Sequence, residues 1–459
     1  MINDPFYQSW SNQTNLHPLG AAAMVSLGLL MLVAPRRYAM WPLIAMACFI
    51  APAQRVVFVS LDFDLLRILV LFGWARLILR SEFHGLKWRL MDWIFTIWAT
   101  WNLLSLTLLR GSLDGFVNAL GQTFDAVGMY FLFRCLIRDW ADLRQTVVGF
   151  VLASIPVAFC FLIESLTGRN LFAFLGGVPE QTMIRDGRLR CQGAFAHPIV
   201  AGCFWASLLP IVIAQRWQGG RGTLIALVGT VTSLVIIGAC ASSTPVAALI
   251  FGSVAAAFYV LRSSMWIVRW TLLVLILGLH MVMQSPVWHL ISRIDIVGGS
   301  TGWHRVNLID QAIAHAHEWW LVGSDLGTAH WGWGTADVTN YYLVQGLHGG
   351  VVQVLLFVAL ISVGFSRIGR ARRAVEGDLA ASVLTWSIGV ALFIHVMNFI
   401  ALSYFGQITM LWYMQLAIIA GPISAAAVSV PTRLRRRRFV RRRAVVPARS
   451  GPLEEAVAI

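Results

Sequence analysis

The residues best suited to chemistry gather in one stretch of the chain, residues 284–350. This stretch interrupts an otherwise strongly apolar sequence and carries more histidines and carboxylates than any other polar segment. Its polar members are Arg293, Asp295, His304, Arg305, Asp310, His315, His317, Glu318, Asp325, His330, Asp337, Asn340 and His348. Histidines and carboxylates are the usual general acids and bases, and arginines bind phosphate groups. The stretch therefore predicts a site for acid–base chemistry or anion binding.

The most informative piece begins at residue 330 and reads His-Trp-Gly-Trp-Gly-Thr-Ala-Asp-Val-Thr-Asn. Its candidate groups are His330 and Asp337 for acid–base chemistry, Asn340 to orient either, and Trp331 and Trp333 to hold sugar rings. The two glycines predict a turn that brings the aromatic faces together, and a general base must lie within hydrogen-bond reach of an acceptor hydroxyl. The alternative is that the tryptophans form an interfacial belt and Asp337 caps the next helix.

Arginines in two long polar loops, 167–196 and 285–349, form a second group of candidates. Guanidinium forks bind phosphate in a bidentate manner. The candidate substrate-binding residues are Arg188, Arg190 and His197 around the first loop, with Arg293, His304 and Arg305 in the second. Arg305 is expected in the first turn of an amphipathic helix over 302–320, where the helix dipole does not favour a cation. Anion binding is therefore the favoured role, and contact with lipid headgroups is the alternative.

Other polar residues are weaker candidates. His315 and His317 are two positions apart, which predicts that they face different sides of a helix and bind no metal together. We expect no metal and no cofactor, because the sequence has no paired metal-ligand motif or nucleotide-binding loop. Acidic residues near the expected span ends (Asp62, Asp64 and Glu164) could line a cavity. The segment 242–245, Ser-Ser-Thr-Pro, is interpreted as a structural turn.

Composition identifies the class of protein that must hold these residues. Of the 459 residues, 58% are hydrophobic and 12% are charged, whereas a soluble domain carries roughly 25% charged residues. The chain is therefore predicted to be an all-α polytopic integral membrane protein. The net charge of +14 does not indicate nucleic-acid binding, because much of it lies in short loops between apolar runs. Only one of the six cysteines, Cys191, lies in a long loop, so no disulfide framework is expected.

Apolar runs long enough to cross a bilayer number about thirteen. They fall at 17–35, 38–53, 66–80, 90–109, 117–137, 145–166, 197–214, 222–241, 244–261, 267–284, 350–368, 380–402 and 406–428. Placing the arginine-rich tail in the cytoplasm puts every other connection there as well, and each of those connections is short and basic, as the positive-inside rule requires. The two long loops then face outward.

The resulting organisation has six parts. They are N-terminal spans at 1–166, a first outward loop at 167–196, central spans at 197–284, a large outward loop with the candidate site at 285–349, C-terminal spans at 350–430 and a basic cytoplasmic tail at 431–459. The first apolar run has no basic region before it, which predicts a retained span instead of a cleaved signal peptide.

The chain resembles the O-antigen polymerase and ligase superfamily of bacterial envelope proteins, especially its exopolysaccharide-polymerase-like members. The resemblance lies in residues 190–198, 301–305, 320–324 and 337–350 and in the many spans with one large late loop. The ligases carry a motif of His-Asn, two residues, Leu, six residues and Gly. Asn340, Leu343 and Gly350 fit this spacing, but Thr339 stands where the ligases have histidine. That departure puts the ligase's base in doubt and assigns any acid–base role to Asp337 or His330.

The resemblance implies glycosyl transfer on the periplasmic face of the bacterial inner membrane, without metal or cofactor. The implied donor is an oligosaccharide on undecaprenyl diphosphate, and the implied acceptor is another lipid-linked repeat unit. Arg190 and Arg305 would bind the diphosphate, with Arg305 acting in catalysis beside Asp337 or His330. Two alternatives stay open: a ligase that moves finished glycan onto a lipid or protein, and a transporter or flippase. Membrane lipid is a further expected partner, nucleic acid is not, and the sequence leaves open whether a chain-length regulator or polysaccharide export proteins take part.

Overall fold

The structure of the chain is a computed structural model, and it describes residues 13–58, 61–293 and 302–424. The expectations for Asp295, Thr301, residues 425–428 and the arginine-rich tail lie outside the described residues. Nearly all of the regular secondary structure in the described residues is helical. The sheets within these residues are two short antiparallel hairpins. In these residues, seven helices are long and apolar enough to cross a membrane.

The helices follow the expected apolar runs. They are α2 (Pro18–Val33), α3 (Met40–Phe49), α4 (Leu65–Leu79), α5 (Leu90–Arg110), α6 (Leu113–Leu136), α7 (Trp140–Thr167), α8 (Pro198–Ile213), α9 (Gly222–Ala239), α10 (Ser243–Ala257), α11 (Met265–Val282), α12 (Gly302–Ala314), α13 (Ala316–Trp319), α14 (Tyr341–Ala374), α15 (Leu379–Ala401) and α16 (Gln407–Ile418), which continues as a π-helix over Ile419–Ile423. Each of the expected runs overlaps one of these helices, and α12 and α13 lie in the large loop.

The helix connections divide into two groups at opposite ends of the antiparallel helices. One group, which we call the basic face, comprises the connections 34–39, 80–89, 137–139, 214–221, 258–264 and 375–378. Direct contacts join these connections or the helix ends beside them: Arg80 to the carbonyl of Val33, Arg36 to Asp142, Arg144 to the carbonyl of Gly219, Gln218 to the carbonyl of Ala380, and Tyr259 to Ser382. The connections that the sequence predicts to share one side of a membrane therefore lie together.

The second group, which we call the loop face, holds the two long loops. It comprises the described parts of the connections 50–64, 111–112, 168–197, 240–242, 283–340 and 402–406. Its members also contact one another: Gln54 with the carbonyl of Leu175, the Cys191 amide with the carbonyl of Ala239, Arg110 with Asp325, Ser403 with the carbonyl of Val338, and Gln407 with the carbonyl of Ala194. The loops that the sequence separates by more than a hundred residues are thus packed at one end of the helices.

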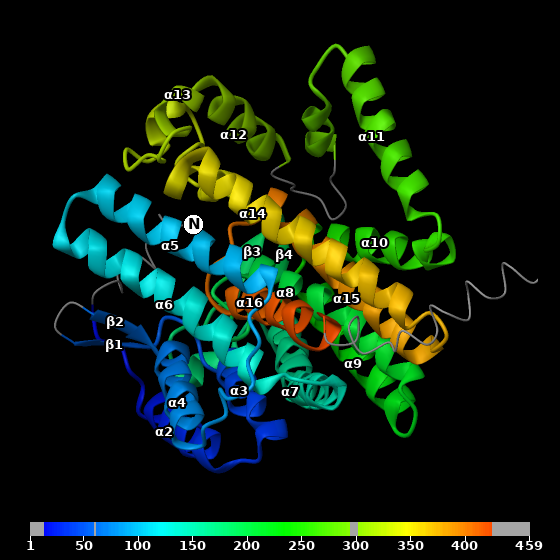
Figure 1. Ribbon diagram of the computed structural model, residues 1–459. Helices are drawn as coiled ribbons and strands as arrows, with labels where there is room; N and C mark the ends of the chain where they lie inside the picture. The colour runs from blue at the N-terminus through cyan, green and yellow to red at the C-terminus, as the bar shows by residue number, and fades with distance from the viewer. Residues whose placement is uncertain (1–12, 59–60, 294–301, 425–459) are drawn as a thin grey trace, which may run out of the picture.

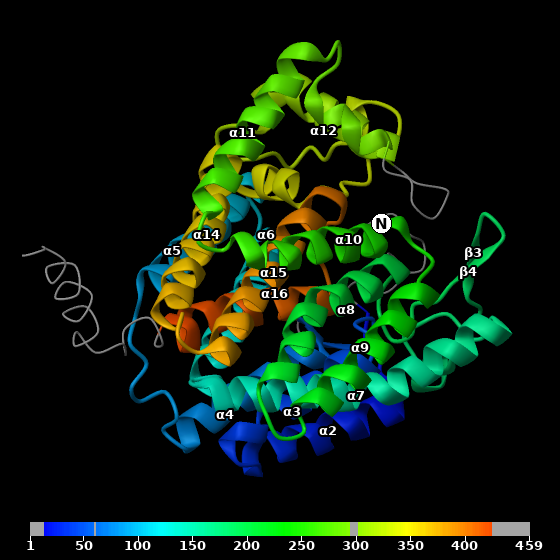
Figure 2. The same ribbon diagram turned by 90° about the vertical axis from the view of Figure 1, so that its right-hand side faces the viewer.

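The first long loop contains a β-hairpin that the sequence analysis did not anticipate. Strand β3 (Met183–Arg185) pairs with β4 (Arg188–Arg190), and Figure 2 shows the hairpin projecting from the helices. Asp186 and Gly187 make the turn with φ of 52° and 73°, and Asp-Gly is a dipeptide that favours a turn with two positive φ angles. The other hairpin pairs β1 (Arg55–Phe58) with β2 (Leu61–Asp64).

The large loop differs from the expectation in two places. The single amphipathic helix over 302–320 is wrong, because the chain breaks at His315 between α12 and α13. The ring centroids of His315 and His317 lie 6.3 Å apart across the break, although the two residues were expected to face different sides of one helix. At its other end, the loop finishes at Asn340 and α14 begins there, with a non-helical step at Gly349 and Gly350 where the span was expected to start.

The core lies around α8 and α16, which Figure 1 shows surrounded by the other helices. Large aromatic side chains fill it, including Phe204, Trp205, Phe357, Phe399 and Trp412. Helix α11, by contrast, stands apart from the assembly and has no buried residue. Apolar residues that cover an unburied helix are typical of contact with lipid.

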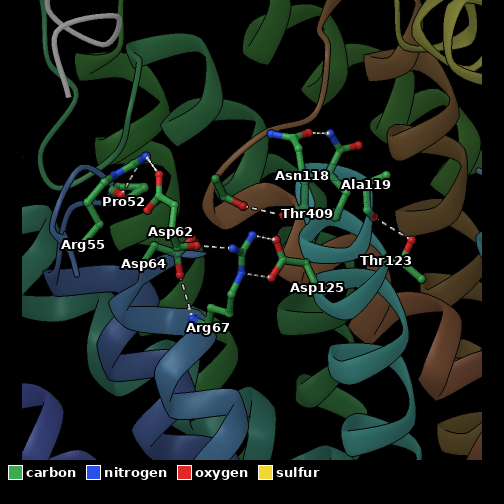
Figure 3. A network of polar contacts seen from close by, with 12 residues as sticks. Pro52, Arg55, Asp62, Asp64, Arg67, Asn118, Ala119, Thr123, Asp125 and Thr409 are labelled. Carbon is green, nitrogen blue, oxygen red and sulfur yellow. Dashed lines mark hydrogen bonds and ion pairs between the residues drawn. The ribbon is translucent and has the colours of Figure 1, made fainter. Parts of the chain in front are cut away.

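Helices α4 and α6 are joined at the loop face by a bidentate ion pair (Figure 3). Arg67 donates from Nε and Nη2 to the two carboxylate oxygens of Asp125 at 2.7 and 2.5 Å, and from Nη1 to the carbonyl of Asp62. The side chain of Asp62 pairs with Arg55 at 2.6 Å, and that of Asp64 caps α4. Asp64 and Asp125 also line a cavity of about 70 Å³. The ion pair thus joins the third and fifth expected spans, α4 and α6.

Candidate functional site

A buried carboxylate fixes the chain segment that carries Arg190. Glu164, in the last turn of α7, is fully buried, and its oxygens accept hydrogen bonds from the amides of Gln192 and Gly193 at 3.0 and 3.1 Å. The hydroxyl of Thr182 donates to the same carboxylate at 3.2 Å. The residues on both sides of hairpin β3–β4 are therefore bound to the end of α7, which sets the position of Arg190 at the end of β4.

Arg190 is buried, and it forms no salt bridge with a carboxylate among the described residues. Its side chain is 5% exposed, and its Nε has no hydrogen-bond partner among the described residues. Nη1 of its guanidinium lies 4.0 Å from the sulfur of Met183. Burial lowers the pKa of Arg190 below its ordinary value, and the positive charge of Arg185 lowers that pKa further. An anion at this position would relieve both effects.

Arg305 has the same character and comes from the other long loop. It lies at the end of the first turn of α12, is 8% exposed, and donates from Nη2 to the hydroxyl of Thr244 at 2.9 Å. Its Nε also lacks a hydrogen-bond partner in the described part of the chain. Burial lowers the pKa of Arg305, and the charge of Arg185 lowers it further while Cys203 opposes the change. Thr244 begins α10, so this contact joins α12 to the turn between α9 and α10.

Both long loops contact the turn between α9 and α10: the Cys191 amide donates to the carbonyl of Ala239, and Arg305 donates to Thr244. Arg185 lies close enough to lower the pKa values of Arg190, His197 and Arg305. For His197, burial is the largest cause, followed by the charges of Arg190 and Arg185, and together they lower its pKa to about 3. The imidazole is therefore neutral, and its Nδ1 accepts a hydrogen bond from the Ile199 amide at 3.1 Å, which caps α8. We call Arg185, Arg190, His197 and Arg305 the arginine cluster.

Two other buried arginines, Arg76 and Arg134, have a different arrangement. Arg76 is fully buried, but both of its terminal groups are satisfied by Glu82 and by the carbonyls of Met31 and Ala34. Buried Arg134 likewise pairs with Asp92 at 2.9 Å. Because a buried charge is costly unless it is paired, an ion pair is the normal arrangement for a structural arginine. Arg190 and Arg305 lack such a carboxylate within salt-bridge distance among the described residues.

The predicted acid–base residue Asp337 lies next to this cluster. Nε2 of His304, the residue before Arg305, is 3.1 Å from the carbonyl oxygen of Asp337. The same segment is held to α12 by Asn307, whose amide donates to the carbonyl of Trp333 at 3.1 Å. These contacts hold the backbone of the segment that carries Asp337 against the first turns of α12, where His304 and Arg305 lie.

Trp333 lies on the surface beside Trp303, whereas Asn340 is buried at the start of α14. Trp333 is 81% exposed and meets the half-exposed Trp303 edge to face, with ring centroids 5.1 Å apart. These two rings present apolar faces to the surroundings beside Arg305. Asn340 caps α14, because its side-chain oxygen accepts a hydrogen bond from the Leu343 amide at 3.1 Å. The cap that the sequence analysis considered for Asp337 is therefore supplied by Asn340.

His330 and Trp331 belong to a different group of contacts. Nε2 of His330 and Nε1 of Trp331 each lie 2.8 Å from the same oxygen of Glu318. Trp331 is 4% exposed and stacks on His315 at 5.3 Å. The hydrogen bond from Trp331 is the largest cause of a lowered pKa at Glu318. These contacts fasten the turn after α13 and leave His330 engaged with Glu318.

The remaining predicted residues lie at the edge of the site. Arg188 starts β4 and is exposed, and Arg293 is exposed at the end of the 3-10 helix Val287–Arg293. Arg185, a member of the cluster, and Thr244, which contacts Arg305, were not among the predicted site residues. The signal for Arg185 was the Asp-Gly turn, which folds the loop back and faces Arg185 across the hairpin to Arg188.

Chemically, the arginine cluster can bind an anionic group with several phosphate oxygens. Asp337 can accept a proton nearby, and Trp303 and Trp333 can cover sugar rings. In the described part of the chain, no group of three or more histidine, cysteine or acidic side chains is arranged to hold a metal ion, and all six cysteines are free. Comparison of the chain with protein-family models and with curated protein sequences gives no match.

Proposed function

We propose that the chain is a membrane glycosyltransferase that polymerises oligosaccharide repeat units carried on undecaprenyl diphosphate. One observation carries the proposal: two buried arginines from two distant loops, each with an unpartnered Nε, share a positive field with Arg185. Two buried guanidinium groups that form no salt bridge among the described residues suit a ligand with several anionic oxygens. A diphosphate attached to a lipid is such a ligand, and it would reach the loop face from the membrane.

In this function, Arg190 and Arg305 bind the diphosphate of the donor. Charge develops on the bridging oxygen as the glycosidic bond breaks, and fixed N–H donors in a buried site stabilise it without reorganisation. Undecaprenyl diphosphate is the leaving group. Arg185 at the hairpin contributes long-range attraction for the anion, and Thr244 holds the fork of Arg305 in place.

Asp337 takes the proton of the acceptor hydroxyl. The contact of its backbone carbonyl with His304, the residue before Arg305, supports this role. The hydrogen bond between His330 and Glu318 supports a structural role for His330. The acceptor is a second lipid-linked repeat unit, and the exposed rings of Trp303 and Trp333 stack on its sugars. A general base of this kind contributes typically 10²–10⁴-fold to the rate.

The proposed location is the inner membrane of a bacterium, with the loop face in the periplasm and the basic face in the cytoplasm. The gathering of the basic connections at one end of the helices supports this orientation. Beyond the seven long apolar helices, α2, α3, α4, α5, α6 and α16 would complete about twelve to thirteen spans.

The proposal is tested by complementing a strain that lacks the gene and scoring its surface polysaccharide by size. The variants are Arg190→Ala, Arg305→Ala and Asp337→Ala, with Arg216→Ala at the basic face as the matched control. We expect the three site variants to reach the membrane at normal levels and to accumulate single lipid-linked repeats, while the control makes long polymer.

Two other results would reject the polymerase assignment. Long polymer that remains on its carrier in the site variants would indicate a ligase. Wild-type polymer in all three site variants would mean that the arginine cluster does not act on the glycan carrier.

A further inference from the structure

A second positively charged site lies at the basic face, far from the arginine cluster. The connection between α4 and α5, the junction of α6 with α7 and the end of the π-helix enclose a cavity of about 140 Å³. Its cationic lining residues are Lys87, Arg89, Arg134 and Arg138. A water molecule occupies roughly 30 Å³ in the liquid, so the cavity has room for a group of several heavy atoms.

The carboxylates near this cavity are already engaged. Both oxygens of Glu82 accept from Arg76 at 2.8 Å. Asp92 accepts from the hydroxyl of Tyr130 at 2.6 Å, from Nε and Nη2 of Arg134 at 2.9 and 3.2 Å, and from the backbone amide of Arg89 at 2.7 Å. These contacts satisfy the carboxylates through partners of their own.

The remaining cationic residues of the cavity, Lys87, Arg89 and Arg138, are not neutralised by these carboxylates. In the part of the chain that the structure describes, no carboxylate lies within 4.0 Å of the charged groups of Lys87, Arg89 or Arg138. The Nε of Arg138 donates to the carbonyl of Cys135 at 2.8 Å, which orients its guanidinium without neutralising it. The cavity thus carries an excess of positive charge.

The ion pair between Arg134 and Asp92 leaves Nη1 of Arg134 available to the cavity. Arg134 uses Nε and Nη2 to bind Asp92, and a Cβ at Gly421 would lie 3.3 Å from its Nη1. The glycine therefore leaves space beside that N–H. Burial lowers the pKa of Arg89, and the charges of Arg134 and Arg367 lower it further, so the mutual repulsion of these cations is only partly offset by Asp92.

We propose that this cavity binds a phosphate group, carried by the headgroup of an anionic phospholipid. The excess cations supply the charge, and Nη1 of Arg134 supplies a fixed donor. Trp88 and Trp93 favour a lipid as the carrier: both are about half exposed, and their rings lie 4.7 Å apart beside the cavity. Exposed tryptophans between basic residues are typical of the interface between a bilayer and water. This site is independent of the glycan carrier proposed at the loop face.

The test measures binding of phosphatidylglycerol and phosphatidylcholine to the full chain in neutral detergent by native mass spectrometry. The variant is Lys87→Gln/Arg89→Gln, which leaves the Asp92–Arg134 pair intact. The matched control is Arg221→Gln/Arg269→Gln, which removes two exposed charges from the same face. We expect the wild type and the control to bind one phosphatidylglycerol about tenfold more tightly than phosphatidylcholine, and the variant to lose that preference.

Soluble phosphate distinguishes the source of the ligand. Calorimetric titration with inorganic phosphate is run on the same three proteins. Suppose that phosphate binds the wild type and the control but not the variant, and that the wild type does not prefer phosphatidylglycerol over phosphatidylcholine. The cavity then binds a soluble anion, and the lipid assignment is overturned. If the variant and control lose phosphatidylglycerol equally, or neither does, the cavity is not a phosphate site.

Discussion

Glu164 anchors the first long loop through three hydrogen bonds, so replacing its carboxylate should make the loop open more easily. In Glu164→Gln, the side chain keeps its shape, but its amide nitrogen replaces one of the two oxygens. One of the donors at Gln192, Gly193 and Thr182 then faces an N–H group instead of an acceptor. A buried donor left unsatisfied costs about 1–3 kcal/mol, and the remaining bonds lose their charge assistance while the cost of burying a charge disappears.

We therefore expect local opening of the loop to become easier by about 2 kcal/mol, which is roughly a 30-fold larger open population. Hydrogen exchange of the Gln192 and Gly193 amides measures this directly, because both hydrogens are bonded to the carboxylate in the native chain. Polymer formation should fall at the same time, since Arg190 precedes these amides by two and three residues. The smaller change Thr182→Val removes one hydrogen bond and should raise exchange only about fivefold.

Two outcomes would refute this reasoning. If exchange of the two amides in Glu164→Gln stays within a factor of two of wild type, the carboxylate does not hold the loop. If exchange rises equally in the core around α8 and α16, the substitution destabilises the whole chain and the anchor is not local. Loss of polymer with unchanged exchange would place the effect of Glu164 outside its contacts with the loop.

Three further substitutions probe the site. Arg305→Lys keeps the charge but loses the guanidinium fork, so the rate of polymer formation in membrane vesicles should fall roughly 10²-fold, while Arg221→Lys leaves it unchanged. His197 has a folded pKa of about 3 against about 6.5 when unfolded, so its contribution to stability is full above pH 6.5 and is lost as the pH falls toward 3. The free energy of unfolding, measured by denaturation, should fall by about 2 kcal/mol between about pH 6.5 and pH 5 in the wild type. In His197→Asn this contribution to the pH dependence should be absent. Gly302→Ala would place Cβ 2.8 Å from a backbone carbonyl of the preceding 3-10 helix, so polymer yield should drop, whereas Gly278→Ala in α11 meets nothing within 4 Å and should leave the yield unchanged.

Much of the helical framework could be predicted because its signals are local. An apolar run of about 20 residues and a basic connection are each visible within a short window. The sequence therefore predicted where the helices lie and which connections meet at one end, down to the short helix α3, which has only ten residues. The same local cues explain the caps, since His197 precedes Pro198 at the start of α8 and Asn340 precedes α14.

The loops were harder because their structure depends on contacts across the chain. The expected helix over 302–320 overlooked the break at His315, where Trp331 from a later turn stacks on the imidazole. Helical periodicity alone cannot register such a contact. The hairpin β3–β4 had a local signal in Asp186-Gly187, but its strands are only three residues long and lack an alternating apolar pattern.

The roles of the arginines show where prediction from sequence must end. Arg134 and Arg190 both sit near a span end, and both are buried. They differ in what the fold brings to them: Asp92, forty-two positions away, pairs with Arg134, while Arg185 adds a second positive charge beside Arg190. A structural arginine and a ligand-binding arginine therefore have the same local sequence signature. What separates them is whether the assembled helices satisfy the charge, and on that criterion Arg190 and Arg305 are the buried arginines at the loop face that are suited to an anion from outside the chain.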